Sequence, residues 1–241
     1  MNTTITEAES RPQNPDGFSV FVVIPGYNEA ATIAEVVWGV QPHASVLVVD
    51  DGSADDTASE AERAGAHVVR LKPNRGYEGA LDAGVAEAAR LGADAVVTFD
   101  ADGQFDPEDL GSVIRPITEG QADLVLGQRP KAARLGEALF NFYSRARFGI
   151  GDFLCGLKGF RITLYERHGR FDCGYSINTE LALYSILNGA RVETVPVRIR
   201  DREVGAPRFG SGFRANRKLF RALRHAIAMD LRSTFPSTGH P

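Results

Sequence analysis

The sequence is poor in cysteine and has no long apolar run. Only Cys155 and Cys173 occur in 241 residues, which excludes a disulfide-stabilised secreted fold and predicts two packed, reduced thiols. No segment approaches the ~20 apolar residues that a membrane-spanning helix needs. The first residues also lack the basic and apolar regions of a secretory signal. We therefore expect a cytoplasmic protein.

Several common site motifs are also missing. The cysteine spacing matches no zinc site, and the histidines do not cluster along the chain: His43, His67, His168, His225 and His240. There is no GxxxxGK[ST] phosphate loop and no GxGxxG glycine pattern. These absences disfavour a P-loop ATPase and an NAD-dependent enzyme.

Charge is divided unevenly between the two halves of the chain. Acidic side chains strongly outnumber basic ones in residues 1–128, the reverse holds in residues 129–232, and the total is a net charge of −4. This division suggests that the first half handles a cation and the second an anion. The acidic first half and the pI of about 5.8 disfavour nucleic-acid binding.

Short apolar runs alternate with helical patterns in the first half. The runs predict buried parallel strands at 18–24, 45–49, 67–71, 95–99 and 123–126. Helices are predicted at 30–40, 55–64, 77–91 and 107–119. This order predicts an α/β fold in a single domain, with a Rossmann-like, mostly parallel, doubly wound sheet that binds ligands at the carboxyl ends of its strands.

The second half has a looser pattern. Helices are predicted at 136–148, 177–187 and 212–231, and strands at 159–163 and 192–199. Residues 1–17 are polar and aperiodic, so we expect a flexible leader there, and we expect a disordered tail at 233–241.

Two carboxylates and an amide follow the fourth predicted strand, in Phe99-Asp100-Ala101-Asp102-Gly103-Gln104. Oxygen ligands of this kind suit Mg²⁺ or Mn²⁺, which bridge protein oxygens to substrate phosphates. The alternative is an Asp-rich turn that caps the helix beginning at Pro107.

Polar segments accompany the other predicted strands: IPGYNE at 24–29, VDDGS at 49–53 and NRGYEGA at 74–80. The Tyr27 ring could stack on a base, and Glu29 and Asp51 could accept hydrogen bonds from a base or ribose. The third segment opens a helix whose N–H groups could accept an anion. A surface aromatic and an ordinary turn are the alternatives.

The ordered set IPGYNE, VDDGS, NRGYEGA and DADGQ resembles the nucleotide-sugar domain of family 2 glycosyltransferases, inverting enzymes of the GT-A fold. Residues 130–210 resemble the dolichyl- and polyprenyl-phosphate hexose synthases of that family. The resemblance implies a glycosyltransferase domain at 18–210, with a nucleotide-sugar half at 18–130 and an acceptor half at 131–210. A basic amphipathic helix at 211–232 would follow.

The resemblance also implies roles for individual residues. The nucleoside would be held by Pro25, Tyr27, Glu29 and Asp51. Asp100 and Ala101 would lie beside the ribose and diphosphate, and Asp102 and Gln104, with Asp100, would bind Mg²⁺ or Mn²⁺.

The second half continues the resemblance. Gly127-Gln128-Arg129 stands where the family has Gly-Ser-Arg, so Arg129 is expected to face phosphate. Residues 152–161 resemble the acceptor segment. Residues 195–208 resemble a mobile loop, in which Arg202 and Arg208 would meet donor and acceptor phosphates and Arg208 replaces the usual Lys. A solvated basic surface is the alternative for any one arginine.

The hypothesised reaction is in-line displacement at the anomeric carbon, with the nucleoside diphosphate leaving. The metal and Arg129 or Arg202 would stabilise its growing charge. A lipid phosphate acceptor is already ionised and needs no strong base. A hydroxyl acceptor needs one, and Glu180 is the best candidate, with an exposed helix position as the alternative.

The leading hypothesis is transfer of a hexose from GDP-mannose or UDP-glucose to polyprenyl phosphate. The basic and apolar residues of helix 212–231 suit anionic headgroups at the cytoplasmic face of a membrane, although a helix packed on the domain is the alternative. A soluble hydroxyl acceptor and a catalytically silent nucleotide-sugar binder remain open.

Overall fold

The structure is a computed structural model that describes residues 17–130, 135–174, 176–200 and 213–234. The leader predicted at 1–17 and the tail predicted at 233–241 lie almost wholly outside these ranges. Arg202 and Arg208 also lie outside the described residues, so their predicted roles stay predictions.

A sheet of seven strands forms the centre of the described chain, in the order β3-β2-β1-β4-β6-β5-β7. The strands are β1 (Val20–Gly26), β2 (Ser45–Asp50), β3 (His67–Arg70), β4 (Ala95–Thr98), β5 (Leu124–Gln128), β6 (Lys158–Arg161) and β7 (Val192–Pro196). Neighbouring strands pair in parallel except at β6, which is antiparallel to both β4 and β5. The mostly parallel α/β sheet in a single domain is confirmed.

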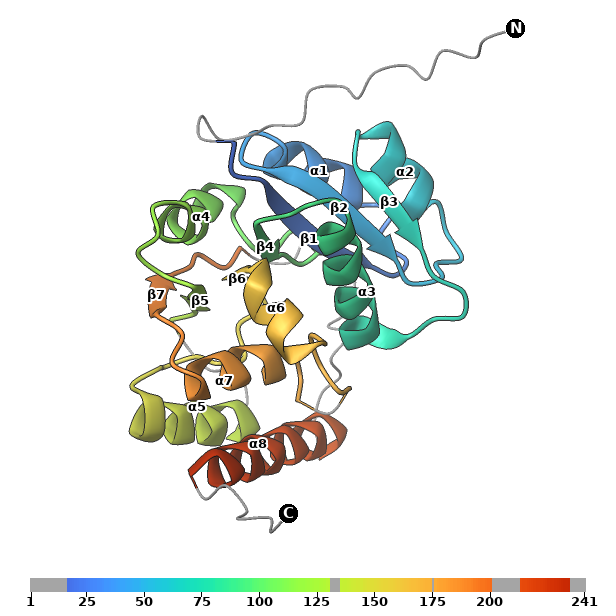
Figure 1. Ribbon diagram of the computed structural model, residues 1–241. Helices are drawn as coiled ribbons and strands as arrows, with labels where there is room; N and C mark the ends of the chain where they lie inside the picture. The colour runs from blue at the N-terminus through green and yellow to red at the C-terminus, as the bar shows by residue number, and fades with distance from the viewer. Residues whose placement is uncertain (1–16, 131–134, 175, 201–212, 235–241) are drawn as a thin grey trace, which may run out of the picture.

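Helices cover both faces of the sheet (Figure 1). Successive side chains of β1 point to opposite faces of the sheet. Val22 and Ile24 pack in one core, and Phe21 and Val23 pack in the other. The first core is covered by α1 (Ile33–Val40), α2 (Thr57–Arg63) and α4 (Leu110–Thr118), and the short 3₁₀ helix η1 (Pro107–Asp109) leads into α4. The second is covered by α3 (Gly76–Arg90), α5 (Leu135–Phe148), α6 (Ile162–His168), α7 (Glu180–Leu187) and α8 (Phe213–Thr234).

The segment around residue 162 differs from the sequence prediction. A strand was expected at 159–163, whereas β6 ends at Arg161 and α6 begins at Ile162. A short apolar run has too few residues to distinguish a buried strand from the start of a helix. The direction of β6 was also not predicted, since a strand buried between two others has the same composition whichever way it runs.

Helix α8 packs along α5 (Figure 1). A Cβ at Gly136 would lie 2.7 Å from Leu219 Cβ, so the glycine permits the close approach. Six large apolar side chains of these two helices remain exposed: Leu135, Leu139, Phe142, Phe220, Ile227 and Leu231. Among the described residues, no helix combines the length and the apolar character that a bilayer crossing requires.

Candidate active site

The loops that follow β1, β2 and β4 are hydrogen-bonded to one another. The Asn28 N–H donates to Ser53 Oγ at 2.9 Å, and the Ala54 N–H donates to Asn28 Oδ1 at 2.8 Å. The Thr32 hydroxyl donates to the Ala101 carbonyl at 2.8 Å. Three of the polar segments picked out in the sequence therefore lie together at the carboxyl edge of the sheet, as parallel strands require.

The residues predicted to hold a nucleoside line this edge. Tyr27 is 41% exposed, so its ring is accessible for stacking. Pro25 is buried at the end of β1, and Glu29 is half-buried with its N–H donating to Thr57 Oγ1 at 2.8 Å. The arrangement leaves Tyr27 as the most accessible of these side chains.

Asp51 has a partner that the sequence did not reveal. Its buried carboxylate accepts the N–H groups of Arg75 at 2.7 Å and Gly76 at 2.8 Å, at the start of α3. The predicted anion at the N-terminus of this helix is thus a carboxylate of the chain itself. Asp51 fixes α3 against the loop after β2, and a contact between Asp51 and a nucleoside stays a prediction.

Asp100 lies where the two halves of the chain meet. Tyr77 in α3 donates its hydroxyl to Asp100 Oδ1 at 2.7 Å, and a Cβ at Gly156 would lie only 2.7 Å from Asp100 Oδ2. Burial and the charge of Asp102 raise the pKa of Asp100 to about 6, although Tyr77, Lys158 and Arg129 lower it. Neither the Tyr77 contact nor the approach of Gly156 was predicted from sequence.

The pair of carboxylates after β4 fits a divalent cation. Asp102 Oδ1 accepts the Gln104 N–H at 3.1 Å, and Asp102 lies near enough to Asp100 to raise its pKa by repulsion. A cation between them would remove that repulsion, and an oxygen-only donor set suits Mg²⁺ or Mn²⁺. Asp100, Asp102 and Gln104 are therefore chemically suitable for the ion predicted there.

The loop after β4 is also tied to the segment that follows β7. The Arg200 N–H donates to the Gln104 carbonyl at 2.8 Å, and Phe105 pairs with Ile199 in an antiparallel bridge. Two arginines strengthen the link through ion pairs: Arg198 with Asp109 at 3.0 Å and Arg200 with Asp106 at 2.8 Å. Residues 198–200, which precede Arg202 and Arg208 in the sequence, are thus anchored beside Gln104.

Arg129 is held by Asp152. Its Nε and Nη2 donate to the two carboxylate oxygens of Asp152 at 2.6 and 3.0 Å, and Glu137 lies 3.8 Å away. Burial acts to lower the pKa of Arg129, but the hydrogen bond and the charge of Asp152 outweigh burial, and the pKa lies above its ordinary value. A side chain expected to face phosphate therefore has an internal partner, and its charge still reaches Asp100.

The neighbouring glutamine explains a departure from the family pattern. Gln128 Oε1 accepts the Asp152 N–H at 2.7 Å, and Gln128 Nε2 donates to the Asp152 carbonyl at 3.1 Å. A serine at this position is too short to make both bonds across the same gap. Gln128 therefore holds the backbone of the residue that orients Arg129.

Lys158 is a buried cation that the sequence analysis did not select. It lies on β6 with 1% exposure, and its ammonium donates to the Cys155 carbonyl at 2.5 Å. Burial lowers its pKa to about 8, and its charge lowers the pKa of Asp100. Two signals in the sequence point to it: its place in the segment 152–161, which resembles the acceptor segment, and its charge inside the apolar run at 153–160.

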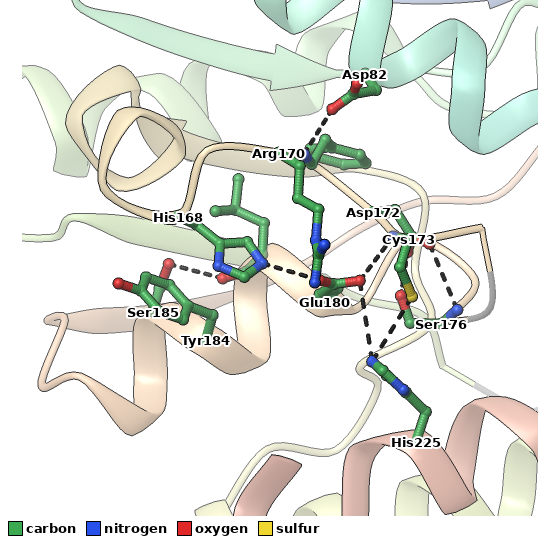
Figure 2. A network of polar contacts seen from close by, with 12 residues as sticks. Asp82, His168, Arg170, Asp172, Cys173, Ser176, Glu180, Tyr184, Ser185 and His225 are labelled. Atoms are coloured by element: carbon green, nitrogen blue, oxygen red, sulfur yellow. Dashed lines mark hydrogen bonds and ion pairs between the residues drawn. The ribbon is translucent and has the colours of Figure 1, made fainter. Parts of the chain in front are cut away.

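Glu180 belongs to a different polar network (Figure 2). It is 1% exposed, so the alternative of an exposed helix position is wrong. Its carboxylate contacts His168 at 2.9 Å, Arg170 at 2.6 Å and the Cys173 N–H at 2.7 Å. Burial raises its pKa, but hydrogen bonds from Cys173, Arg170 and His168 lower it to about 2. Such a carboxylate is a weak general base.

A family model and several curated proteins match this chain. The model of Glycosyl transferase family 2 matches residues 21–172. Polyprenol monophosphomannose synthase of Mycolicibacterium smegmatis is 30% identical over 230 residues, which cover 86% of each chain. Undecaprenyl-phosphate mannosyltransferase of Micrococcus luteus is 27% identical over 216 residues, covering 80% of this chain and 88% of the relative.

A solved structure shares the fold. Glucosyl-3-phosphoglycerate synthase from Mycobacterium tuberculosis, crystallised with Mn²⁺, uridine diphosphate and glucosyl-3-phosphoglycerate, superposes with a TM-score of 0.69 and 23% identity. The match covers 90% of this chain and 80% of that one. At this identity the likeness supports a GT-A-like architecture.

Proposed function

The chain belongs to glycosyl transferase family 2, and from this premise we propose that it moves a hexose from a nucleotide sugar of the GDP-mannose or UDP-glucose type to polyprenyl phosphate. The observation that carries the proposal is the position of Asp100. It joins the loops of the nucleotide-sugar half, through Tyr77, to the acceptor segment, through Gly156. A donor bound on the first side would meet an acceptor bound on the second.

The donor would lie along the ends of β1, β2 and β4. The exposed ring of Tyr27 would stack on the base, with Glu29 and Asp51 available to its polar edge and the ribose. Asp100, Asp102 and Gln104 would hold Mg²⁺ or Mn²⁺, which would supply positive charge to the leaving diphosphate. Tyr77 orients the Asp100 carboxylate for that task.

The acceptor phosphate would meet cations of the second half. Arg129 and Lys158 both act on Asp100, and Asp152 keeps Arg129 in a fixed position. Arg202 and Arg208 would add further positive charge from the segment anchored by Arg198 and Arg200. An ionised phosphate attacks without a general base, which agrees with the low basicity of Glu180.

A lipid acceptor requires contact with a membrane surface, and α5 with α8 would provide it. Leu139 and Phe142 on α5 and Phe220 on α8 are exposed apolar side chains. Exposed basic residues accompany them on α8: Arg217, Lys218, Arg221 and Arg224. Apolar side chains beside cations suit the interface of a bilayer with anionic headgroups, at the cytoplasmic face in this proposal.

The experiment is a transfer assay with labelled GDP-mannose and UDP-glucose. Purified protein is mixed with polyprenyl phosphate in vesicles and Mg²⁺ or Mn²⁺, and the organic phase is counted. We expect label in the lipid only when polyprenyl phosphate and a divalent ion are both present. Label that enters a soluble hydroxyl acceptor instead, and ignores polyprenyl phosphate, would contradict the acceptor assignment.

A further inference from the structure

A second cluster of polar side chains lies at the junction of α6, α7 and α8 (Figure 2). Cys173 comes from the connection between α6 and α7, Glu180 begins α7, and His225 lies on α8. The sequence shows neither a zinc spacing nor a group of histidines, because His225 is far along the chain from Cys173 and Glu180. The fold brings them together, which spacing along the sequence does not indicate.

The three side chains are spaced like ligands of one metal ion. One ligand atom from each lies within 4.8 Å of the other two. Cys173 Sγ is 3.7 Å from His225 Nε2, and that nitrogen is 3.9 Å from Glu180 Oε2. Tetrahedral zinc, with bonds of about 2.0–2.3 Å, places neighbouring ligand atoms roughly 3.3–3.6 Å apart. The distances from His225 to Cys173 and to Glu180 exceed these values by a few tenths of an ångström.

The Glu180 carboxylate is oriented for such a role. Its Oε1 contacts His168 at 2.9 Å and Arg170 at 2.6 Å. Its Oε2 lies toward Cys173 and His225 (Figure 2). Metal-binding carboxylates are commonly held in this way, by hydrogen bonds to groups outside the ligand set. His168, one of these outer groups, is itself held by stacking on Tyr184, at 4.2 Å between ring centroids.

We propose that Cys173, Glu180 and His225 form a zinc-binding site. A thiolate, an imidazole and a carboxylate are ligands that prefer Zn²⁺ to Mg²⁺, in contrast to the oxygen-only set of Asp100 and Asp102. Binding would release the Cys173 thiol proton to solvent, because only the thiolate is a good ligand. Three protein ligands leave one tetrahedral position for water.

The site would connect α8 to the body of the domain. His225 is the ligand that α8 contributes to the site, whereas the other two ligands come from the α6–α7 region. Zinc bound across this junction would stabilise the packing of α8 by mass action, since the unfolded chain lacks the assembled site. The proposal does not depend on the transferase reaction, because it concerns a different set of residues.

The test is cobalt and zinc binding by the full chain under reducing conditions. Reduced wild-type protein with Co²⁺ should show a thiolate-to-metal charge-transfer band, and equilibrium dialysis in excess Mg²⁺ should give one Zn²⁺ per chain. Cys173→Ser should remove the band, and both Cys173→Ser and His225→Gln should weaken zinc binding about tenfold or more. His43→Gln and Asp102→Asn are controls that should bind zinc as the wild type does.

Several results would overturn the site. The first result needs only the wild-type protein. If it shows no thiolate band with Co²⁺, the cluster is a hydrogen-bond network without a metal. A band that persists in Cys173→Ser would assign the thiolate to Cys155 instead. Loss of zinc in Asp102→Asn would place the ion at the β4 edge. The wild-type measurement applies even if a variant fails to fold.

Discussion

The carboxylates of Asp100 and Glu180 have opposite electrostatic surroundings. Burial and a neighbouring carboxylate raise the pKa of Asp100 to about 6. Burial also disfavours the charged form of Glu180, but hydrogen bonds from Cys173, Arg170 and His168 lower its pKa to about 2. One region therefore holds excess negative charge, whereas the other neutralises its carboxylate with groups of the chain.

This difference separates a carboxylate pair whose mutual repulsion a bound cation would relieve from a carboxylate that already has donors and cations of the chain beside it. Repulsion between Asp100 and Asp102 should lower the stability of the folded chain, and a cation bound there would relieve it. Perturbed groups of this kind gather at functional sites. The ion pairs around Glu180 stabilise the fold without any ligand. Amide substitutions at the two sites should therefore have opposite effects on stability, and only one should abolish catalysis directly.

The largest effect is expected from Asp102→Asn. Loss of one carboxylate proposed to bind the metal should reduce turnover on the order of a thousandfold, because charge stabilisation of the leaving group would be lost. The measurement is the initial rate of label transfer at saturating Mn²⁺. Asp56→Asn is the matched control, since Asp56 is exposed and makes no capping hydrogen bond at α2. Normal turnover in Asp102→Asn would remove the metal assignment.

The next effect is a loss of stability in Glu180→Gln. The substitution leaves Arg170 and His168 without a buried anion, and we expect the free energy of unfolding to fall by about 3 kcal/mol. This value is the lower end of the range for buried pairs because Arg170 is half-exposed. Urea unfolding measures it. Glu119→Gln, at an exposed pair with Arg115, should change stability by less than about 0.5 kcal/mol.

The contribution of Glu180 should also depend on pH. Its pKa is lower in the folded chain than in the unfolded one, so its stabilising effect is fully present above about pH 4.5 and is lost as the pH falls toward about 2. The difference in unfolding free energy between wild type and Glu180→Gln should shrink by roughly half at pH 3. A difference that grows with acidity would mean that Glu180 is protonated in the folded chain.

The smallest effect is a gain in stability in the metal-free Asp102→Asn variant. Removal of one of two mutually repelling carboxylates should raise the free energy of unfolding by about 1 kcal/mol in the presence of chelator. Differential scanning calorimetry with and without Mn²⁺ measures it, and the gain should vanish when the wild type is saturated with Mn²⁺. A loss of stability in chelator would show that the Gln104 hydrogen bond outweighs the repulsion.

The location of the Asp100 region could be predicted from the sequence, but much of its chemistry could not. The ends of parallel strands fall on one edge of a sheet, so β-branched runs followed by polar turns are enough to find it. The Tyr77–Asp100 bond depends on how α3 lies across that edge. The buried charge of Lys158 depends on β6, whose direction its short apolar sequence leaves open.

The Glu180 region was harder to predict for a related reason. Its partners His168 and Arg170 lie at the end of α6 and just beyond it, and α6 was absent from the predicted elements. The burial of Glu180 follows from long-range packing of α6, α7 and α8, which local periodicity does not record. A single glutamate on a helix is ordinarily exposed, so the sequence alone left an exposed position and a catalytic base both open.

The link between the loop after β4 and the segment after β7 bears on how this scaffold could be re-engineered. Arg198 and Arg200 are joined by ion pairs to Asp109 and Asp106 across the boundary between the two halves. A chimaera that takes its acceptor half from a relative would separate each arginine from its aspartate. Grafts designed to change substrate preference should therefore transfer all four residues together, or leave all four unchanged.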